Sequence, residues 1–459
     1  MIGTENGKNR RTGALLLLLH FILGLTCLAL PEAAESGAAT AWVRSYQDPG
    51  YPVNEAAAMA LDGQGNVYIT GSSGDYATDF DCLTVKYSPG GDLLWTRRYN
   101  GPAGGYDEPK AIAVDSQGNI YVAGTSLGFW TDDDFLTIKY SPDGQELWVR
   151  RAKGPDLSGG ELVAMAVDSQ DNVYVTGYSG YFGTLTIKYD TNGQRLWRRY
   201  YDKAEARAMS VDIQGNVYIA GESILFKSNV IKYDTNCRRL WVREYDDRFF
   251  STSGITLDAQ GNVVVTGTLW DWDKIENFLT IKYSPEGRRL WARRYHGPET
   301  DFFGEAYNEP NAIAADAQGN VYVTGFTQGP RRWSLLGYDS AFCTTIKYSP
   351  GGRLLWARHY SARWPGWNFS NSIFVDALGN VYATGASDVS EGERDYATLK
   401  YSSEGQLIWG TLYHSPGQAI NESLAIRPDG QGNVYVTGYS SDEWGDNSHY
   451  LTIKYTQIP

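Results

Sequence analysis

The sequence predicts an all-β fold, an eight-bladed β-propeller whose blades are four-stranded antiparallel sheets. The Asp that opens a D-x-x-G-N turn recurs eight times, from Asp62 to Asp429, at intervals of 44 to 60 residues, a spacing typical of propeller blades. Each repeat holds four short apolar runs separated by turn-forming clusters. The chain opens on a fourth strand, Trp42 to Tyr46, and stops on a third strand, Leu451 to Tyr455. The N-terminal strand is therefore expected to complete the last blade and close the ring.

The N-terminus has the layout of a secretory signal peptide. A basic stretch at residues 8–11 is followed by an apolar run at 14–30 and then by small residues, the order that such signals share. Small residues at the two positions that a signal peptidase reads predict cleavage after Ala38. We therefore assign 1–38 to a signal peptide and 41–459 to the propeller. Because the apolar run is about as long as the shorter membrane spans, an uncleaved anchor is the alternative.

The rest of the chain indicates a folded protein that is secreted, periplasmic or held at the cell surface, and we expect a monomer. Thr26 precedes Cys27, a poor match to a lipoprotein box, so no lipid anchor is expected. No later apolar run reaches membrane-spanning length. The net charge of −13 argues against nucleic acid and anionic lipid surfaces as partners, because both reward basic patches. Three cysteines remain, too few for a disulfide scaffold, and are expected to be buried: Cys82, Cys237 and Cys343.

Each strand of the repeat has its own pattern. The innermost strand is apolar and small, the second ends at a Gly in every repeat, and the third carries a Lys-Tyr pair. On the fourth strand Trp, Arg and Tyr stand at i, i+2 and i+4, hence on one face. We expect this ladder to pack one blade against the next, and each third-strand Lys to pair with a carboxylate. Thr411 alone replaces the Arg of the ladder, which is otherwise Arg44, Arg97, Arg150, Arg199, Arg243, Arg293 and Arg358.

The repeated residues D-x-x-G-N-V-Y-V-T-G, T-I-K-Y and G-x-x-L-W-x-R-x-Y resemble the bacterial beta-propeller repeat family called SBBP. The resemblance implies an extracytoplasmic propeller and carries no common reaction or catalytic motif. The family label implies seven blades, whereas the repeats of this sequence number eight. The segment from Tyr140 to Trp148 also resembles, more distantly, the tryptophan-docking repeat of eight-bladed quinoprotein dehydrogenases. Those enzymes carry a vicinal Cys pair beside the cofactor, and no two Cys are adjacent here, so no cofactor is expected.

Loop lengths distinguish the two faces of the predicted disc. Turns between first and second strands, and between third and fourth, are short and nearly invariant. Connections from second to third strand, and from fourth strand to the next blade, vary widely. Both variable connections lie on the same face of an up-and-down blade. Function is therefore expected on that face.

Seven tryptophans outside the ladder fall in these variable connections. Acidic residues accompany them, and aromatic rings beside carboxylates suit carbohydrate or a basic or aromatic peptide equally well. The alternative is that the rings fold back over their own loops. The candidate ligand-binding residues are Trp130, Trp270, Trp272, Trp333, Trp364, Trp367 and Trp444.

A broken ring of glutamates is expected at the mouth of the axial channel. Seven residues before the turn Asp stands a Glu in six of eight repeats, with Ser251 and Phe369 in the other two. Carboxylates as near to one another as these attract a cation or raise one another's pKa. The ring could therefore hold a metal ion or a cationic group. The alternative is that each Glu accepts hydrogen bonds from the neighbouring blade's backbone or pairs with a basic residue. The candidates are Glu55, Glu108, Glu161, Glu205, Glu309 and Glu422.

Conventional catalytic arrangements are absent from the sequence. The five His are scattered, and no H-E-x-x-H, G-x-S-x-G or G-x-x-x-x-G-K-[ST] motif occurs. We therefore expect a non-catalytic propeller, a ligand-binding or protein-interaction scaffold that acts through its variable face on carbohydrate or peptide. The alternatives are a hydrolase or lyase that attacks polysaccharide with axial glutamates and a quinoprotein-like oxidoreductase.

Overall fold

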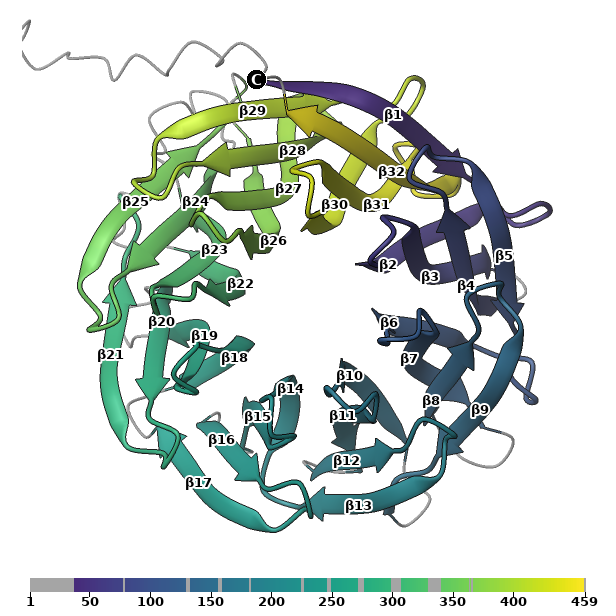
Figure 1. Ribbon diagram of the computed structural model, residues 1–459. Helices are drawn as coiled ribbons and strands as arrows, with labels where there is room; N and C mark the ends of the chain where they lie inside the picture. The colour runs from purple at the N-terminus through teal and green to yellow at the C-terminus, as the bar shows by residue number, and fades with distance from the viewer. Residues whose placement is uncertain are drawn as a thin grey trace, which may run out of the picture.

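The computed structural model shows an all-β chain of 32 strands arranged around a common axis (Figure 1). It describes residues 37–457 except 77–78, 129–132, 156–158, 181–182, 224–226, 246–248, 271–275, 299–306, 329–339, 363 and 365. The expected signal peptide lies outside these residues but for its last two positions. Within the described residues no helix is both long enough and apolar enough to span a membrane.

Six sheets are four-stranded and follow the chain in consecutive groups of four. The first strand of each group faces the axis and the fourth forms the outer rim (Figure 1). The groups are β2 Val53–Leu61, β3 Val67–Asp75, β4 Asp79–Tyr87, β5 Leu93–Tyr99; β6 Asp107–Val114, β7 Ile120–Leu127, β8 Asp133–Tyr140, β9 Glu146–Ala152; β10 Gly160–Val167, β11 Val173–Ser179, β12 Gly183–Tyr189, β13 Arg195–Tyr201; β14 Glu205–Val211, β15 Val217–Glu222, β16 Ser228–Tyr233, β17 Arg239–Tyr245; β18 Phe249–Leu257, β19 Val263–Trp270, β20 Glu276–Tyr283, β21 Arg289–Tyr295; and β22 Asn308–Ala315, β23 Val321–Gln328, β24 Ala341–Tyr348, β25 Leu354–Tyr360.

The seventh sheet has eight strands and contains both ends of the propeller. Its two four-stranded units are joined by one parallel bridge, Arg394 to Ile420, between β28 and β30. Seven hydrogen-bonded sheets therefore stand where the sequence predicts eight separate blades. The strands are β26 Asn368–Val375, β27 Val381–Ser390, β28 Glu393–Tyr401, β29 Leu407–Tyr413; and β30 Ile420–Pro428, β31 Val434–Ser441, β32 Ser448–Gln457, β1 Ala38–Tyr46.

The N-terminal strand pairs with the C-terminal one. β1 runs antiparallel to β32, from Ala38 opposite Gln457 to Tyr46 opposite Tyr450, and takes the rim position that β5 or β9 takes in its own sheet (Figure 1). The strand begins at Ala38, three residues before the predicted start of the domain.

The core lies between neighbouring units. Second and third strands are buried along almost their whole length, and each apolar cluster joins side chains of two adjacent units. The Gly that ends each second strand has no Cβ and so lets the backbone of the first strand approach closely. A Cβ on Gly177 would stand 2.0 Å from the backbone oxygen of Glu161 in the first strand, a distance that no side chain tolerates.

The Trp-Arg ladder clamps one unit to the next. Seven of the eight ladder tryptophans donate Nε1–H to a carbonyl in the neighbouring unit's turn between third and fourth strand, at 2.9 to 3.2 Å. Arg97 shows the partner contact: its guanidinium lies 5.6 Å from the Trp95 ring and its Nε donates to the carbonyl of Gly144. The predicted packing role is therefore confirmed.

The third-strand lysines contact backbone carbonyls of the next unit more often than the predicted carboxylates. Lys139 donates to the carbonyl of Thr191 in the next unit and also lies 3.2 Å from the Asp115 carboxylate. Carboxylate partners within 4 Å occur for two further lysines, Lys188 and Lys282. Elsewhere the carbonyl contact dominates, as from Lys86 to Pro142. Most of the charge is thus compensated by backbone dipoles in addition to carboxylates.

The unit of β26 to β29 comes just before the unit that holds both chain ends. It lacks part of the Trp-Arg ladder for a structural reason. Its neighbour has no turn between third and fourth strand, because the chain begins and ends there. Trp409 is buried, yet its Nε1 has no partner among the described residues. Gln457 of β32 takes the place of a turn carbonyl as acceptor for Lys400. Thr411 replaces Arg where no turn carbonyl is available.

Candidate functional site

The variable connections carry exposed aromatic side chains, but not only the predicted ones. Trp444, between β31 and β32, is 80% exposed. Trp270, Trp364 and Trp367 are 36 to 38% exposed. Trp130, Trp272 and Trp333 lie outside the described residues. One of the seven predicted rings therefore stands free in solvent, and three are partly covered.

The three half-covered tryptophans favour the capping alternative in part. Trp270 donates Nε1–H to the carboxylate of Glu276 at 2.8 Å across its own hairpin. Trp367 packs edge-on against Phe326, with ring centroids 5.4 Å apart, and the two line a shallow slot with Tyr307. The slot has a volume of about 10 Å³, room for a single water molecule.

A second aromatic group, which the sequence reasoning missed, lies between β3–β4 and β6. Tyr76 is 65% exposed and meets the edge of Phe80, with centroids 5.3 Å apart. Phe80 in turn stacks on Tyr106, at 5.9 Å and 17° between planes, and Tyr106 is 51% exposed. We call Tyr76, Phe80 and Tyr106 the aromatic strip. Its signal was present in the sequence, since all three residues stand in or beside variable connections, but only tryptophans were counted.

The backbone beneath the aromatic strip is unusual. Asp79, next to Phe80, has φ of +86°, a conformation that non-glycine residues rarely adopt. Such conformations cost about 1–3 kcal/mol and cluster at functional sites. The chain therefore holds Phe80 in place at a local cost in stability.

The predicted glutamates stand at the axial ends of the innermost strands, on the same face. For three of the six, an Asn before the Glu fixes its position: Asn54 donates its side-chain amide to the carbonyl of Ser448 in the preceding unit at 3.2 Å, and Asn308 and Asn421 make the equivalent bond. The glycine at the end of the second strand accommodates the carbonyl of the same Glu. The ring is thus built by the repeat itself.

Several of the six glutamates are neutralised by neighbours. Lys110 lies 2.8 Å from the carboxylate of Glu108 and 3.5 Å from that of Glu161. Glu205 pairs with Arg207 at 3.1 Å. These ion pairs are the predicted alternative, pairing with a basic residue. Glu422 instead accepts hydrogen bonds from the side chains of Asn371 and Tyr439 in neighbouring strands, not from the predicted backbone.

Glu55 and Glu309 differ from the other four. Desolvation raises the pKa of Glu55, and the negative charges of Glu108 and Glu422 raise it further. Desolvation also raises the pKa of Glu309, with Glu276 adding to it. Among the described residues neither carboxylate has a hydrogen bond or ion pair to a side chain, and no group of three or more His, Cys, Asp or Glu could hold a metal ion.

Tyr76 of the aromatic strip lies within electrostatic reach of Glu55 and Asp446. Burial raises the pKa of Tyr76, and the negative charges of Glu55 and Asp446 add to the shift. Asp446 belongs to the same connection as Trp444. We call this surface the loop-face site: the aromatic strip, Trp444 and Asp446 with Glu55 at its axial side. Flat apolar rings beside acceptor-only carboxylates suit ligands with an apolar face and hydrogen-bond donors.

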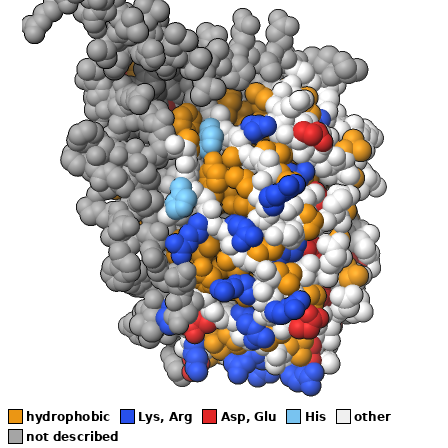
Figure 2. Space-filling view, turned by 90° about the vertical axis from the view of Figure 1, so that its left-hand side faces the viewer, with side chains coloured by type: hydrophobic (Ala, Val, Ile, Leu, Met, Phe, Trp, Pro, Cys, Tyr) orange, Lys and Arg blue, Asp and Glu red, His pale blue; other side chains and the backbone are white. Residues whose placement is uncertain are grey.

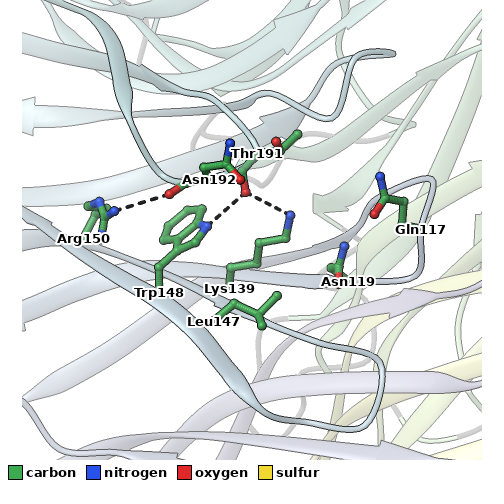
Figure 3. Close-up of a pocket in the computed structure, with 8 residues that line it drawn as sticks. All are labelled: Gln117, Asn119, Lys139, Leu147, Trp148, Arg150, Thr191 and Asn192. Carbon is green, nitrogen blue, oxygen red and sulfur yellow. Dashed lines mark hydrogen bonds between the residues drawn. The ribbon is translucent and has the colours of Figure 1, made fainter.

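The opposite, turn-lined face has a larger hollow of about 750 Å³ between two units (Figure 3). Trp148 and Lys139 both donate to the carbonyl of Thr191, and Arg150 donates to Asn192 and Gly193. Its donors already have partners within the fold. The hollow is therefore lined by the same Trp-Arg contacts that join neighbouring units. Its exposed polar side chains are Gln117 and Asn192.

Comparison with known proteins agrees with the architecture. Residues 94–129 match the family described as beta-propeller repeat, SBBP. Among solved structures, one titled "Structure of Dos1 propeller" aligns with a TM-score of 0.58 at 9% identity, over 91% of this chain and 95% of that chain. Another, titled "Crystal structure of the eukaryotic initiation factor", aligns with a TM-score of 0.43 at 8% identity, over 84% and 89%. No curated protein matches.

Proposed function

We propose that this β-propeller, which contains an SBBP repeat, is an exported, non-catalytic binding module that takes carbohydrate or peptide at the loop-face site. Export is supported by the basic, apolar and small segments at residues 8–38. We count the ring as eight blades, with β1 as the rim strand of the last. A single backbone bridge links the two units of the eight-stranded sheet, which supports the count.

The observation that carries the proposal is the exposure of the aromatic strip. Soluble proteins rarely present contiguous aromatic surface unless it contacts a partner. Tyr76 and Tyr106 expose more than half of their side chains and are held through Phe80 in a fixed arrangement. A preorganised aromatic surface loses little conformational entropy on binding.

The test is a binding screen of glycans and peptides by calorimetry, with Tyr76→Ala and Tyr106→Ala as site variants. Removing one stacked ring is expected to weaken binding about tenfold or more. Leu378→Ala is the matched control, because Leu378 is 82% exposed on the opposite face. Equal affinity of all three variants and the wild type would exclude the loop-face site.

A second candidate function rests on Glu55 alone. A carboxyl group whose pKa is raised by desolvation and by two neighbouring carboxyl groups has the environment of a general acid for glycoside cleavage. Polysaccharide turnover that Glu55→Gln abolishes, with glycan binding retained, would favour a hydrolase over a binding module.

A further inference from the structure

Arginine is concentrated on the outer rim of the propeller. The eight rim strands together hold fourteen Arg, no Lys and only two Glu, although the chain as a whole carries −13. Half of these arginines occupy the ladder position and serve the clamp between units. Of the others, Arg98 and Arg151 pair with carboxylates and Arg198 donates to the carbonyl of Lys153.

Three further rim-strand arginines, together with three from the turns just before rim strands, gather over β13, β17, β21 and β25. Arg195, Arg239 and Arg289 stand two residues before the ladder Trp, and Arg238, Arg288 and Arg353 stand three before it. All six are exposed. In the unit of β5 the same positions hold Leu93 and Asp92. We call the six residues the arginine rim; it is a property of one sector and not of the repeat.

Exposed leucines alternate with these arginines. The residue before each ladder Trp in this sector is Leu196, Leu240, Leu290 or Leu355, each 39 to 49% exposed. Figure 2, which views this side of the ring, shows basic and hydrophobic side chains intermingled over the described surface, with few acidic ones. The sector therefore presents both positive charge and apolar area.

Two of the guanidinium groups lie over aromatic rings. Arg239 lies 5.6 Å from the centroid of the Tyr201 ring, and Arg289 5.7 Å from that of Tyr245. A guanidinium presents several N–H groups in a fixed fork, which can bind phosphate oxygens in pairs. Arg238 lies 3.3 Å from Asp234, but the Arg238 side chain is 78% exposed, so the pair contributes little.

We propose that the arginine rim docks the propeller on an anionic lipid surface. Arginine pairs with lipid phosphate while leucine enters the interface between headgroups and acyl chains. An acidic polysaccharide would engage the arginines and leave the leucines in water, so the mixture favours lipid. The net charge of −13 gives no indication of this surface, because it sums over the whole chain.

The test is co-sedimentation of the full chain with phosphatidylcholine vesicles, with and without phosphatidylglycerol, at low and high salt. Binding to the anionic vesicles is expected to exceed binding to the neutral ones, and the difference is expected to fall steeply with salt. The combined variant Arg238→Gln, Arg239→Gln, Arg288→Gln and Arg289→Gln is expected to weaken it on the order of 100-fold. The apolar run at 14–30 is common to all variants and does not distinguish the two lipids.

Two further variants keep the test decisive if the combined variant unfolds. Arg238→Gln with Arg288→Gln leaves Arg239 and Arg289 intact and still predicts about a tenfold loss. Leu290→Ser is expected to weaken binding, whereas Leu94→Ser, equally exposed beside Asp92, is not. Equal binding to neutral vesicles, unchanged binding of the folded variants, or retention by alginate but not by vesicles would each overturn the proposal.

Discussion

Removing residues 1–46 is expected to open the ring at the junction of β1 and β32. The truncation deletes β1, Ala38–Tyr46, and with it the antiparallel backbone pairing to β32. It also removes the buried Trp42 ring, whose Nε1 donates to the Pro89 carbonyl at 3.1 Å, and the Arg44 clamp on Gly91. An unpaired edge then remains on β32.

The magnitude follows from these contacts. Loss of one buried Trp costs about 3–5 kcal/mol, and each lost hydrogen bond adds about 1 kcal/mol. The free energy of unfolding should therefore fall by at least about 5 kcal/mol, which lowers the Tm on the order of 10 °C. Trp42→Ala alone should account for about half or more of the effect.

The assay is thermal unfolding followed by circular dichroism, together with size exclusion to detect association through the open edge. Trp444→Ala is the matched control: the same side chain is removed, but it is 80% exposed, so the Tm should change by less than about 2 °C. An unchanged Tm after removal of residues 1–46 would refute the pairing of the two chain ends as a source of stability.

Three further outcomes are expected. Trp356→Phe should cost about 1 kcal/mol more than Trp409→Phe in chemical denaturation, because the Trp356 Nε1 donates to a turn carbonyl and that of Trp409 has no partner among the described residues. Gly177→Ala should cost more than about 3 kcal/mol, since its Cβ would meet a backbone oxygen at 2.0 Å, whereas Gly63→Ala, with open space around it, should be nearly neutral. Desolvation between neighbouring side chains, aided by Arg358, lowers the pKa of His359 to about 4, so the unfolded state binds the extra proton. Because His359 is also exposed to solvent at one edge, screening keeps the effect on stability small. Stability measured by denaturant titration should therefore fall slightly as pH drops from about 6.5 to 4, and less in His359→Gln.

The repeat made the strands and the clamp predictable, because both depend on local patterns that recur. The D-x-x-G-N turns occur as expected: Asp115 accepts from the backbone of Gln117 and Asn119. The sharing of one sheet by two units was not predictable. It depends on a single contact at Arg394 that no repeat pattern encodes.

The face of the disc that bears the candidate site could be predicted from the sequence, but the residues that form the site could not. Loop length identified the correct side of the disc for the axial glutamates, yet the contact of Lys110 in β6 with Glu161 in β10 depends on the spatial meeting of two units. The aromatic strip likewise joins Phe80 to Tyr106 across a gap between units. Such contacts arise from tertiary packing, which the repeat pattern does not contain.

Hydrogen–deuterium exchange with a ligand obtained from the glycan and peptide screen tests the central claim most directly, because it reports where the propeller is covered. Protection is predicted in the peptides that contain Tyr76, Phe80, Tyr106 and Trp444. The turns around Gln117 and Leu378 should be unchanged. Protection of those turns, with none in the loop-face peptides, would contradict the account.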